Sequence, residues 1–195
     1  MASFRVCLVS AVMLSFGLLS ACSGTDTSES KESATTTRAA EATMPAINDI
    51  EVTSDAFADG APIPATYSCT GANQSPPLTW TVHASADRLA LIMDDPDAVG
   101  GTFTHWVVTD IPTTTTSAPA GRAPDGGVVS TNSSGRAAYL GPCPPAGTGV
   151  HHYRFTIHTL PHPLDLDPET PVAQAISTIE AASLGYGRLT GTYTG

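Results

Sequence analysis

The sequence of 195 residues has few basic residues, with 8 Lys and Arg against 18 Asp and Glu. Proteins that bind nucleic acids use basic surface to neutralise phosphates. A formal net charge of −10 is the opposite of what such a surface requires. The composition therefore argues against a nucleic-acid partner.

The sequence also lacks an apolar run long enough to cross a bilayer comfortably, which takes about 20 residues. Its longest run, from Val6 to Leu19, follows the basic residue Arg5 and ends in small residues. This order of basic, apolar and small residues is typical of a secretory signal peptide, which we place at residues 1–21. An N-terminal anchor helix is the less favoured alternative.

The tetrapeptide "LSAC" that closes this run resembles the lipobox of bacterial lipoproteins. The resemblance implies that Cys22 carries a diacylglycerol and becomes the first mature residue. At about 0.8 kcal/mol per buried methylene, two or more acyl chains hold a protein stably on a bilayer. We expect an exported protein, lipid-anchored to the outer face of the cytoplasmic membrane. A diderm outer membrane is the alternative.

After the lipidated cysteine, the composition divides the chain into a tether and one domain. Residues 22–45 are poor in apolar side chains and rich in Ser, Thr, Ala and Glu, so they cannot bury enough surface to fold alone. Residues 46–195 are long enough for one domain with an adequate core. Without Arg5, 7 Lys and Arg remain against 18 acidic residues, and the formal charge becomes −11.

Cysteine is scarce, with 4 in the chain. Cys7 leaves with the signal peptide and Cys22 takes the lipid, which leaves Cys69 and Cys143. In an exported protein, two remaining cysteines predict a disulfide, which would contribute about 4 kcal/mol for a loop of this length. Two buried free thiols are the alternative.

Strand patterns dominate the domain, and frequent Pro and Gly keep the segments short. The β-branched and aromatic content predicts strands at 50–54, 78–82, 88–95, 103–111, 153–160 and 189–195. One helix is predicted after Thr170, its cap, with Pro171 in the first turn and Gly185 beyond its end. Residues 119–138 have the character of a long Gly-rich loop. The fold class is mostly β, a sandwich with a helix near the C terminus.

Several polar residues fall on apolar faces near strand ends. Alternation puts Asp95 on the buried side of its strand, and places His105 on one face with Phe103 and Val107. His151 and Tyr153, two apart, also share a face. A turn-capping carboxylate and a satisfied core histidine are the plain alternatives for Asp95 and His105.

On the other face of the same strand, His152 and Arg154 are expected to be solvated. Asp97 belongs to the turn that Pro96 begins, and His83 is a polar-face residue of its strand.

The segments "SPPLTW", "DDPDA", "THWVV", "GPCPP" and "GTGVHHYRF" resemble the phosphatidylethanolamine-binding protein (PEBP) family, in its bacterial Raf-kinase-inhibitor-like branch. The resemblance runs from Ile50 to Tyr193. It implies a two-sheet β-sandwich with short peripheral helices and a small pocket for phosphate, acetate or a phospholipid head group, with no cofactor and no metal. The positions that match the family's pocket are Asp95, His105, Pro144, Pro145, His151 and Tyr153, with Asp97 in support.

Two positions depart from the family pattern. Val99 stands where many members have proline, which implies a less rigid loop. Thr104 stands where many have an aromatic residue, which implies a different pocket mouth.

The chemistry of these residues suits an oxyanion. Two imidazoles and a phenol can donate hydrogen bonds, which are about twice as strong when one partner is charged. A carboxylate at the far nitrogen of a histidine favours the imidazolium form. Backbone amides of residues 146–149 could add an anion-binding nest. The leading interpretation is a non-enzymatic binding module for a small anionic ligand.

Three other functions stay open. The domain could bind a protein partner, for example as an inhibitor of an envelope enzyme. An Asp/His cluster could serve a hydrolase, although no G-x-S-x-G nucleophile elbow is present. A metal could use His151, His158 and His162, although strand alternation puts His151 and His158 on opposite faces.

Overall fold

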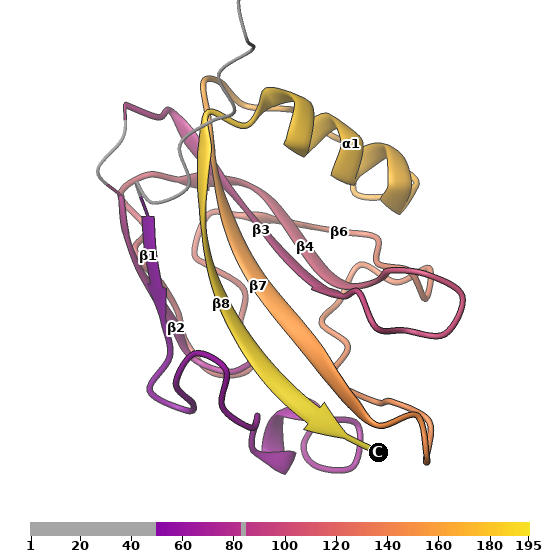
Figure 1. Cartoon of the computed structure of the whole chain (residues 1–195). Coiled ribbons are helices and arrows are strands. Elements are labelled where there is room, and N and C mark those ends of the chain that lie inside the picture. Colours follow the sequence, from indigo (N-terminus) through magenta and orange to yellow (C-terminus); the bar gives the residue numbers. More distant parts are fainter. Residues whose placement is uncertain (1–49, 83–84) are drawn as a thin grey trace, which may run out of the picture. The chain divides into compact units, whose positions relative to one another are not determined.

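The computed structural model describes residues 50–82 and 85–195, and strands are the main regular structure among them (Figure 1). The expected signal peptide, Cys22, the tether and His83 lie outside the described residues. Two antiparallel sheets are present, which confirms the expected mostly-β fold.

The larger sheet has five strands in the order β6-β4-β3-β7-β8, and the smaller has three in the order β1-β2-β5. The larger contains β6 (Val128–Ser130), β4 (Phe103–Pro112), β3 (Arg88–Asp95), β7 (Val150–Leu160) and β8 (Gly185–Thr194). The smaller contains β1 (Ile50–Thr53), β2 (Leu78–Val82) and β5 (Ser117–Ala118). Each predicted strand is present. Neither β5 nor β6 was expected, and β6 lies inside the segment predicted as a Gly-rich loop.

The helix α1 (Val172–Ala182) lies across the outer face of the larger sheet (Figure 1). Pro171 rather than Thr170 occupies its N-cap, and no side chain caps it, so the expected Thr170 cap is wrong. Gly185 lies beyond the helix as expected, and it begins β8. The only other helix among the described residues is the short 3-10 turn η1 (Ala65–Tyr67). Neither helix is both long and apolar enough to span a bilayer.

Two apolar clusters hold the layers together. The larger fills the space between the sheets and includes Trp80, Trp106 and Phe155, each at most 2% exposed. The smaller lies between the five-stranded sheet and α1, where Ile179 packs with Ile92 and their neighbours. Because β3, β4 and the second half of β7 are covered on both faces, their buried residues follow one another instead of alternating with exposed ones.

A β-bulge interrupts β4 beside the cavity described below. Asp94 of β3 pairs with Thr104, but its neighbour Met93 pairs with Trp106, so His105 is an extra residue in β4. The bulge reverses the alternation: Trp106 belongs to the core between the sheets, and Val107 to the cluster under α1. The expectation that His105 and Val107 share a face is therefore wrong. Bulges commonly re-aim a side chain in this way.

The outer edge of β8 is covered by the chain segment 59–63. Gly60 and Ile63 donate backbone hydrogen bonds to the carbonyls of Thr190 and Thr192, and Thr192 donates to Ala61. The Asp59 carboxylate accepts from the Thr190 amide at 2.8 Å. The lower part of this edge strand therefore has its backbone groups paired.

The outer face of β7 contains a buried histidine, His158, which is 7% exposed. Its Nδ1 lies 3.0 Å from Ser183 Oγ. Burial, with the charge of Arg188 as a lesser cause, lowers the pKa of His158 to about 4. The folded protein therefore keeps His158 neutral under conditions in which an unfolded chain would protonate it.

We expect this histidine to make the domain less stable as the pH falls from about 6.5 to about 4. In this pH range the unfolded state binds a proton at His158 that the folded state does not bind. Protonation of His158 in the unfolded state should therefore lower the free energy of unfolding by roughly 2–3 kcal/mol at pH 4.5. Urea unfolding at pH 7 and pH 4.5 measures the loss. In His158→Asn, whose amide can still pair with Ser183, the loss should shrink by that amount. An equal loss in both proteins would contradict the assignment.

Candidate functional site

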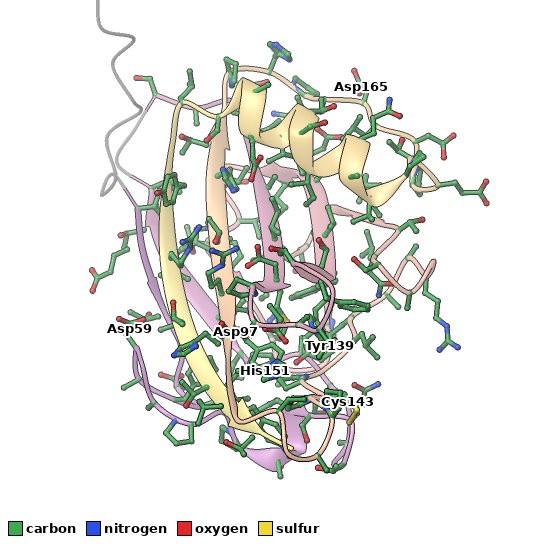
Figure 2. The ribbon with its side chains drawn as sticks, turned by 45° about the vertical axis from the view of Figure 1, so that its right-hand side comes forward. Asp59, Asp97, Tyr139, Cys143, His151 and Asp165 are labelled. Carbon is green, nitrogen blue, oxygen red and sulfur yellow. A yellow bond between two sulfur atoms is a disulfide. The ribbon has the colours of Figure 1, made fainter. Side chains whose placement is uncertain are left out.

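A cavity of about 250 Å³ opens at the end of the larger sheet away from α1. Its walls come from the end of β3, the start of β4, the start of β7 and the loop between residues 140 and 145. Figure 2 shows His151 and Cys143 at this end of the molecule. The six residues expected to form a pocket all line the cavity: Asp95, His105, Pro144, Pro145, His151 and Tyr153.

Asp95 and His151 form a buried pair at the back of the cavity. His151 Nδ1 donates to Asp95 Oδ2 at 2.7 Å, and both side chains are at most 4% exposed. The other carboxylate oxygen, Oδ1, accepts from the amide of Asp97 at 2.9 Å. Asp95 caps the turn after β3, which is the plain alternative given for it above. Its other carboxylate oxygen also orients His151, which is the role expected for it in a pocket.

The second nitrogen of His151 also has a partner. Its Nε2 lies 2.9 Å from Thr148 Oγ1, and the same hydroxyl lies 2.8 Å from the carbonyl of Pro145. The hydroxyl has one hydrogen, and the role of Nε2 depends on which of these two acceptors receives it. The contacts hold the ring between Asp95 and Thr148, with Nδ1 donating to the carboxylate.

Asp97 lies outside the cavity lining and supports the turn, as expected. Its Oδ2 accepts from the amide of His152 at 2.9 Å and from His152 Nδ1 at 2.7 Å. The hydrogen bonds to His152 lower the pKa of Asp97. His152 is exposed, as expected, but Arg154 is not merely solvated, because it forms a two-pronged ion pair with Asp94.

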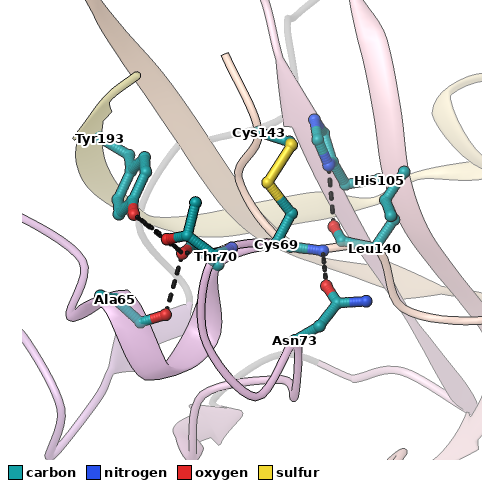
Figure 3. Close-up of a disulfide and its surroundings, with 10 residues drawn as sticks. Ala65, Cys69, Thr70, Asn73, His105, Leu140, Cys143 and Tyr193 are labelled. Atoms are coloured by element: carbon teal, nitrogen blue, oxygen red, sulfur yellow. Dashed lines mark hydrogen bonds between the residues drawn. A yellow bond between two sulfur atoms is a disulfide. The ribbon is translucent and has the colours of Figure 1, made fainter. Parts of the chain in front are cut away.

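His105 faces the cavity from β4 and is 5% exposed. Its Nδ1 donates to the carbonyl of Leu140 at 2.8 Å (Figure 3). Its ring packs against Phe103, with centroids 4.8 Å apart, and edge-on against Tyr153 at 5.2 Å. Burial lowers the pKa of His105, and the hydrogen bond to Leu140 offsets this only in part.

Tyr153 is fully buried, and its hydroxyl makes no well-formed hydrogen bond among the described residues, although the Asp95 side chain and the Cys143 backbone lie close enough to affect its pKa. Burial and then the charge of Asp95 raise its pKa, so the phenol stays a hydrogen-bond donor. A buried polar group without a partner is rare in native structures, because leaving it unpaired costs about 1–3 kcal/mol. Tyr153 lines the cavity, and a ligand atom that reaches its hydroxyl could accept from it.

The disulfide between Cys69 and Cys143 holds the cavity wall in place, which confirms the expected bridge (Figure 3). The Cys69 amide also donates to the carbonyl of Pro142. Next to it, the Gly141 amide donates to Asn73 Oδ1 at 2.8 Å. A Cβ at Gly141 would lie 2.3 Å from the carbonyl oxygen of Tyr67, so only glycine allows this close approach.

The loop at residues 146–149, expected to add an anion nest, has one of its four amides paired: Thr148 donates its amide to the carbonyl of Pro145. Gly147 and Gly149 both have positive φ, 84° and 92°, which lets the chain turn sharply on each side of Thr148. The loop also places the Thr148 hydroxyl 2.9 Å from His151 Nε2. The anion nest stays a prediction.

Asn132, which sequence reasoning missed, anchors the loop over His105. It is 1% exposed, and its amide donates to the carbonyls of His105 and Ala138 at 3.3 and 2.8 Å. Its Oδ1 accepts from Ser134 and Arg136. Nothing local in "STNSSG" distinguishes this asparagine from its neighbours.

The two departures from the family pattern have different outcomes. Val99 is 79% exposed and belongs to the cavity lining. Thr104 points to the opposite face of β4, into the groove beneath α1, so the expected effect of Thr104 on the pocket mouth is wrong. Phe103, one residue earlier, supplies the aromatic wall.

Two larger hollows lie elsewhere, with volumes of about 620 and 760 Å³. The first lies between α1 and the sheet, where Arg154 is already paired with Asp94. The second lies beside β1 and β8. We take the smaller cavity as the candidate site, because it contains Tyr153 and the buried Asp95–His151 pair.

The histidines proposed for a metal do not come together. His151 faces the cavity, His158 lies on the other face of β7, and His162 follows that strand in an exposed turn. Within residues 50–82 and 85–195, no group of three metal-ligating side chains is close enough to hold an ion.

Comparison with known proteins matches residues 53–194 to the family model described as phosphatidylethanolamine-binding protein. A Mycobacterium tuberculosis protein named "Putative lipoprotein LppC" is 51% identical over 160 residues, which cover 82% of this chain and 80% of that protein. A UPF0098 protein of Methanothermobacter thermautotrophicus is 44% identical over 144 residues, covering 71% of this chain and 94% of that protein.

Two solved structures are also similar. E. coli YbcL, described as a new member of the mammalian PEBP family, superposes with a TM-score of 0.70 at 29% identity, covering 75% of this chain and 98% of YbcL. A PEBP homolog from Chlamydia trachomatis superposes with a TM-score of 0.69 at 30% identity, covering 76% of this chain and 99% of that one.

Proposed function

The chain belongs to the phosphatidylethanolamine-binding protein family, and on this premise we propose that its cavity binds the oxyanion of a small phosphate-bearing ligand without catalysing a reaction on it. The observation that carries the proposal is that Tyr153 lines the cavity and that its buried hydroxyl makes no well-formed hydrogen bond among the described residues. A ligand oxygen that accepts from Tyr153 would remove the cost of leaving it unpaired.

The charges around the cavity support an anion. We propose that His151 binds the ligand as a cation that donates from both ring nitrogens, with Asp95 fixing its orientation. Because the Asp95 charge offsets that of His151, we expect weak affinity for inorganic phosphate. A volume of about 250 Å³ is below the range usual for drug-sized ligands, so it suits a head group and excludes acyl chains.

The N-terminal pattern supports a location for this site. We propose that Cys22 is lipidated, that residues 23–45 form a tether, and that the domain faces outward from the cytoplasmic membrane. The "LSAC" motif and the lipoprotein name of the M. tuberculosis relative support this. Metabolic labelling with a fatty acid tests the anchor, and label that persists in Cys22→Ala would contradict it.

The direct test follows histidine ring signals by NMR while the purified protein is titrated with phosphate and with O-phosphoethanolamine. We expect saturable shifts of His105 and His151, which are lost in His105→Ala and His151→Ala. If neither compound moves a histidine signal, the cavity is not an anion site. A protein partner would then become the leading explanation.

Tyr153→Phe should separate binding from stability. Removing the unpaired hydroxyl should leave the free energy of unfolding unchanged or raise it by up to about 1 kcal/mol, and weaken O-phosphoethanolamine binding about tenfold. Urea unfolding and calorimetric titration measure the two quantities.

The matched control is Tyr139→Phe, which removes a hydroxyl that donates to the Tyr67 carbonyl at 2.8 Å. This variant should lose about 1 kcal/mol of stability and keep its affinity. Equal affinities of Tyr153→Phe and the wild type would show that this hydroxyl does not contact the ligand.

A further inference from the structure

The cavity contains a hydrogen-bond acceptor whose direction is fixed by the backbone. His105 Nδ1 lies 2.8 Å from the carbonyl of Leu140, and a carbonyl can only accept, so Nδ1 carries a hydrogen. In the neutral ring, Nε2 then carries a lone pair and no hydrogen. Among the described residues no group donates to Nε2, while the ring lines the cavity. A ligand that fits must therefore bring a hydrogen to this nitrogen, or the nitrogen must gain a proton.

The surroundings of His105 favour the neutral ring. Asp94 and Asp95 of β3 and the Leu140 carbonyl favour the charged form, whereas His151 of β7 opposes it. Burial outweighs these influences and lowers the pKa of His105 below its usual 6.5. Tyr153, whose ring lies against that of His105, is uncharged.

The groups beside this acceptor are donors. The Tyr153 hydroxyl has a hydrogen and no well-formed hydrogen bond, and His151, as the proposed cation, offers the hydrogen on Nε2, the nitrogen next to Thr148. An oxyanion that replaces Thr148 would accept from both. One side of the cavity thus donates to a ligand, and the other side, at neutral pH, accepts from it.

From this polarity we propose that the cavity selects phosphomonoesters over phosphodiesters; the inference rests on the proposed function. A monoester phosphate can present a P–OH hydrogen to His105 Nε2 and its charged oxygens to Tyr153 and His151. A diester has no P–OH hydrogen. Its free oxygens and His105 Nε2 are both acceptors, so they would repel each other and form no hydrogen bond. The phosphate of an intact phospholipid such as phosphatidylethanolamine is a diester, whereas O-phosphoethanolamine and phosphatidic acid are monoesters.

The proposal has a proton balance that can be measured. The bound complex contains one proton between the phosphate oxygen and Nε2, and no covalent bond changes. A monoester brings this proton itself below its second pKa of about 6, and above that pH it must take one up from solvent. Its affinity should be constant below pH 6 and fall about tenfold per pH unit well above it. A diester needs a proton on His105 at any pH above the lowered pKa of that ring.

The experiment compares O-phosphoethanolamine with glycerophosphoethanolamine, which has the same amine and a diester phosphate without acyl chains. Calorimetric titration at pH 6.0 and 7.5, in two buffers of different ionisation heat, gives affinities and the protons taken up. At pH 6.0 we expect the monoester to bind at least about tenfold more tightly, because the diester leaves a buried acceptor unpaired. At pH 7.5 monoester binding should take up close to one proton.

The matched variant is His105→Asn. Its side-chain amide can still donate to the Leu140 carbonyl, but it has no atom in place of Nε2. We expect the monoester preference and the proton uptake to disappear, because the monoester loses its bond to Nε2 while the diester no longer faces that lone pair. Urea unfolding checks that the variant is folded, and Tyr139→Phe should keep the full preference.

The outcomes separate this inference from the function on which it rests. Equal affinity for both compounds at both pH values, without proton uptake, would overturn the selectivity and leave anion binding standing. Binding of neither compound would overturn both. Vesicles containing phosphatidic acid identify the source of the monoester: binding to them assigns a lipid, and binding of O-phosphoethanolamine alone assigns a soluble compound. Either result supports the selectivity.

Discussion

Replacing both Cys69 and Cys143 by alanine is expected to lower the free energy of unfolding by about 4 kcal/mol. The bridge closes a loop with a sequence separation of 74 residues, and a cross-link of this span strongly restricts the unfolded chain. Domains of this size have about 5–15 kcal/mol of stability, so the variant should be only marginally folded. Urea unfolding at pH 7 measures the difference.

Reduced wild-type protein is the control, because it keeps both side chains and lacks only the bond. If reduced protein and the double variant lose the same amount, the cross-link rather than side-chain packing is responsible. Ligand affinity should fall in both, because Cys143 lies in the cavity wall next to Pro144. A loss below about 1 kcal/mol would show that the loop is held by its other contacts, such as the Gly141–Asn73 hydrogen bond.

Asp95→Ala should have the second-largest effect, a loss of about 3 kcal/mol or more. The substitution removes one partner of a buried ion pair and leaves His151, 2% exposed, without its acceptor. It also removes the acceptor for the Asp97 amide in the turn after β3. Urea unfolding measures the loss, and a loss within 1 kcal/mol of zero would contradict the pairing.

Asp95→Asn separates the charge from the hydrogen bonds. Its amide oxygen can still accept from the Asp97 amide, and its NH₂ can donate to a neutral His151, so stability should fall by only about 1 kcal/mol. Binding of O-phosphoethanolamine should weaken about tenfold, because a neutral imidazole replaces the cation. Nitrogen-15 NMR of the ring checks the cause: both nitrogens of His151 should be protonated in the wild type, and Nδ1 should lose its hydrogen in the variant.

Much of the site followed from strand alternation and the order of motifs. His151 and Tyr153 are two apart on β7, so they had to share a face, and Asp95 had to end β3 on the buried side. The disulfide followed from the export signal and the number of cysteines. These inferences work because each depends on local periodicity or on chain chemistry.

What the sequence did not predict depends on contacts between distant segments. The bulge at His105 arises from the pairing of β4 with β3, and no periodicity within "FTHWVV" reveals an extra residue. Asn132 and the Leu140 carbonyl fix His105 across 27 and 35 residues of sequence. Thr148 was considered only for its backbone amide in the loop 146–149, because the role of its side chain depends on where the turn directs the hydroxyl.

The segment 59–63, which pairs with the outer edge of β8, has a consequence for the solution behaviour of the protein. An open edge strand is a template on which a second molecule can add a strand, and this is a common start of aggregation. Here backbone hydrogen bonds from Gly60 and Ile63 already occupy that edge, and Asp59 places a negative charge beside it. This edge of the larger sheet should therefore not accept a strand from a second molecule.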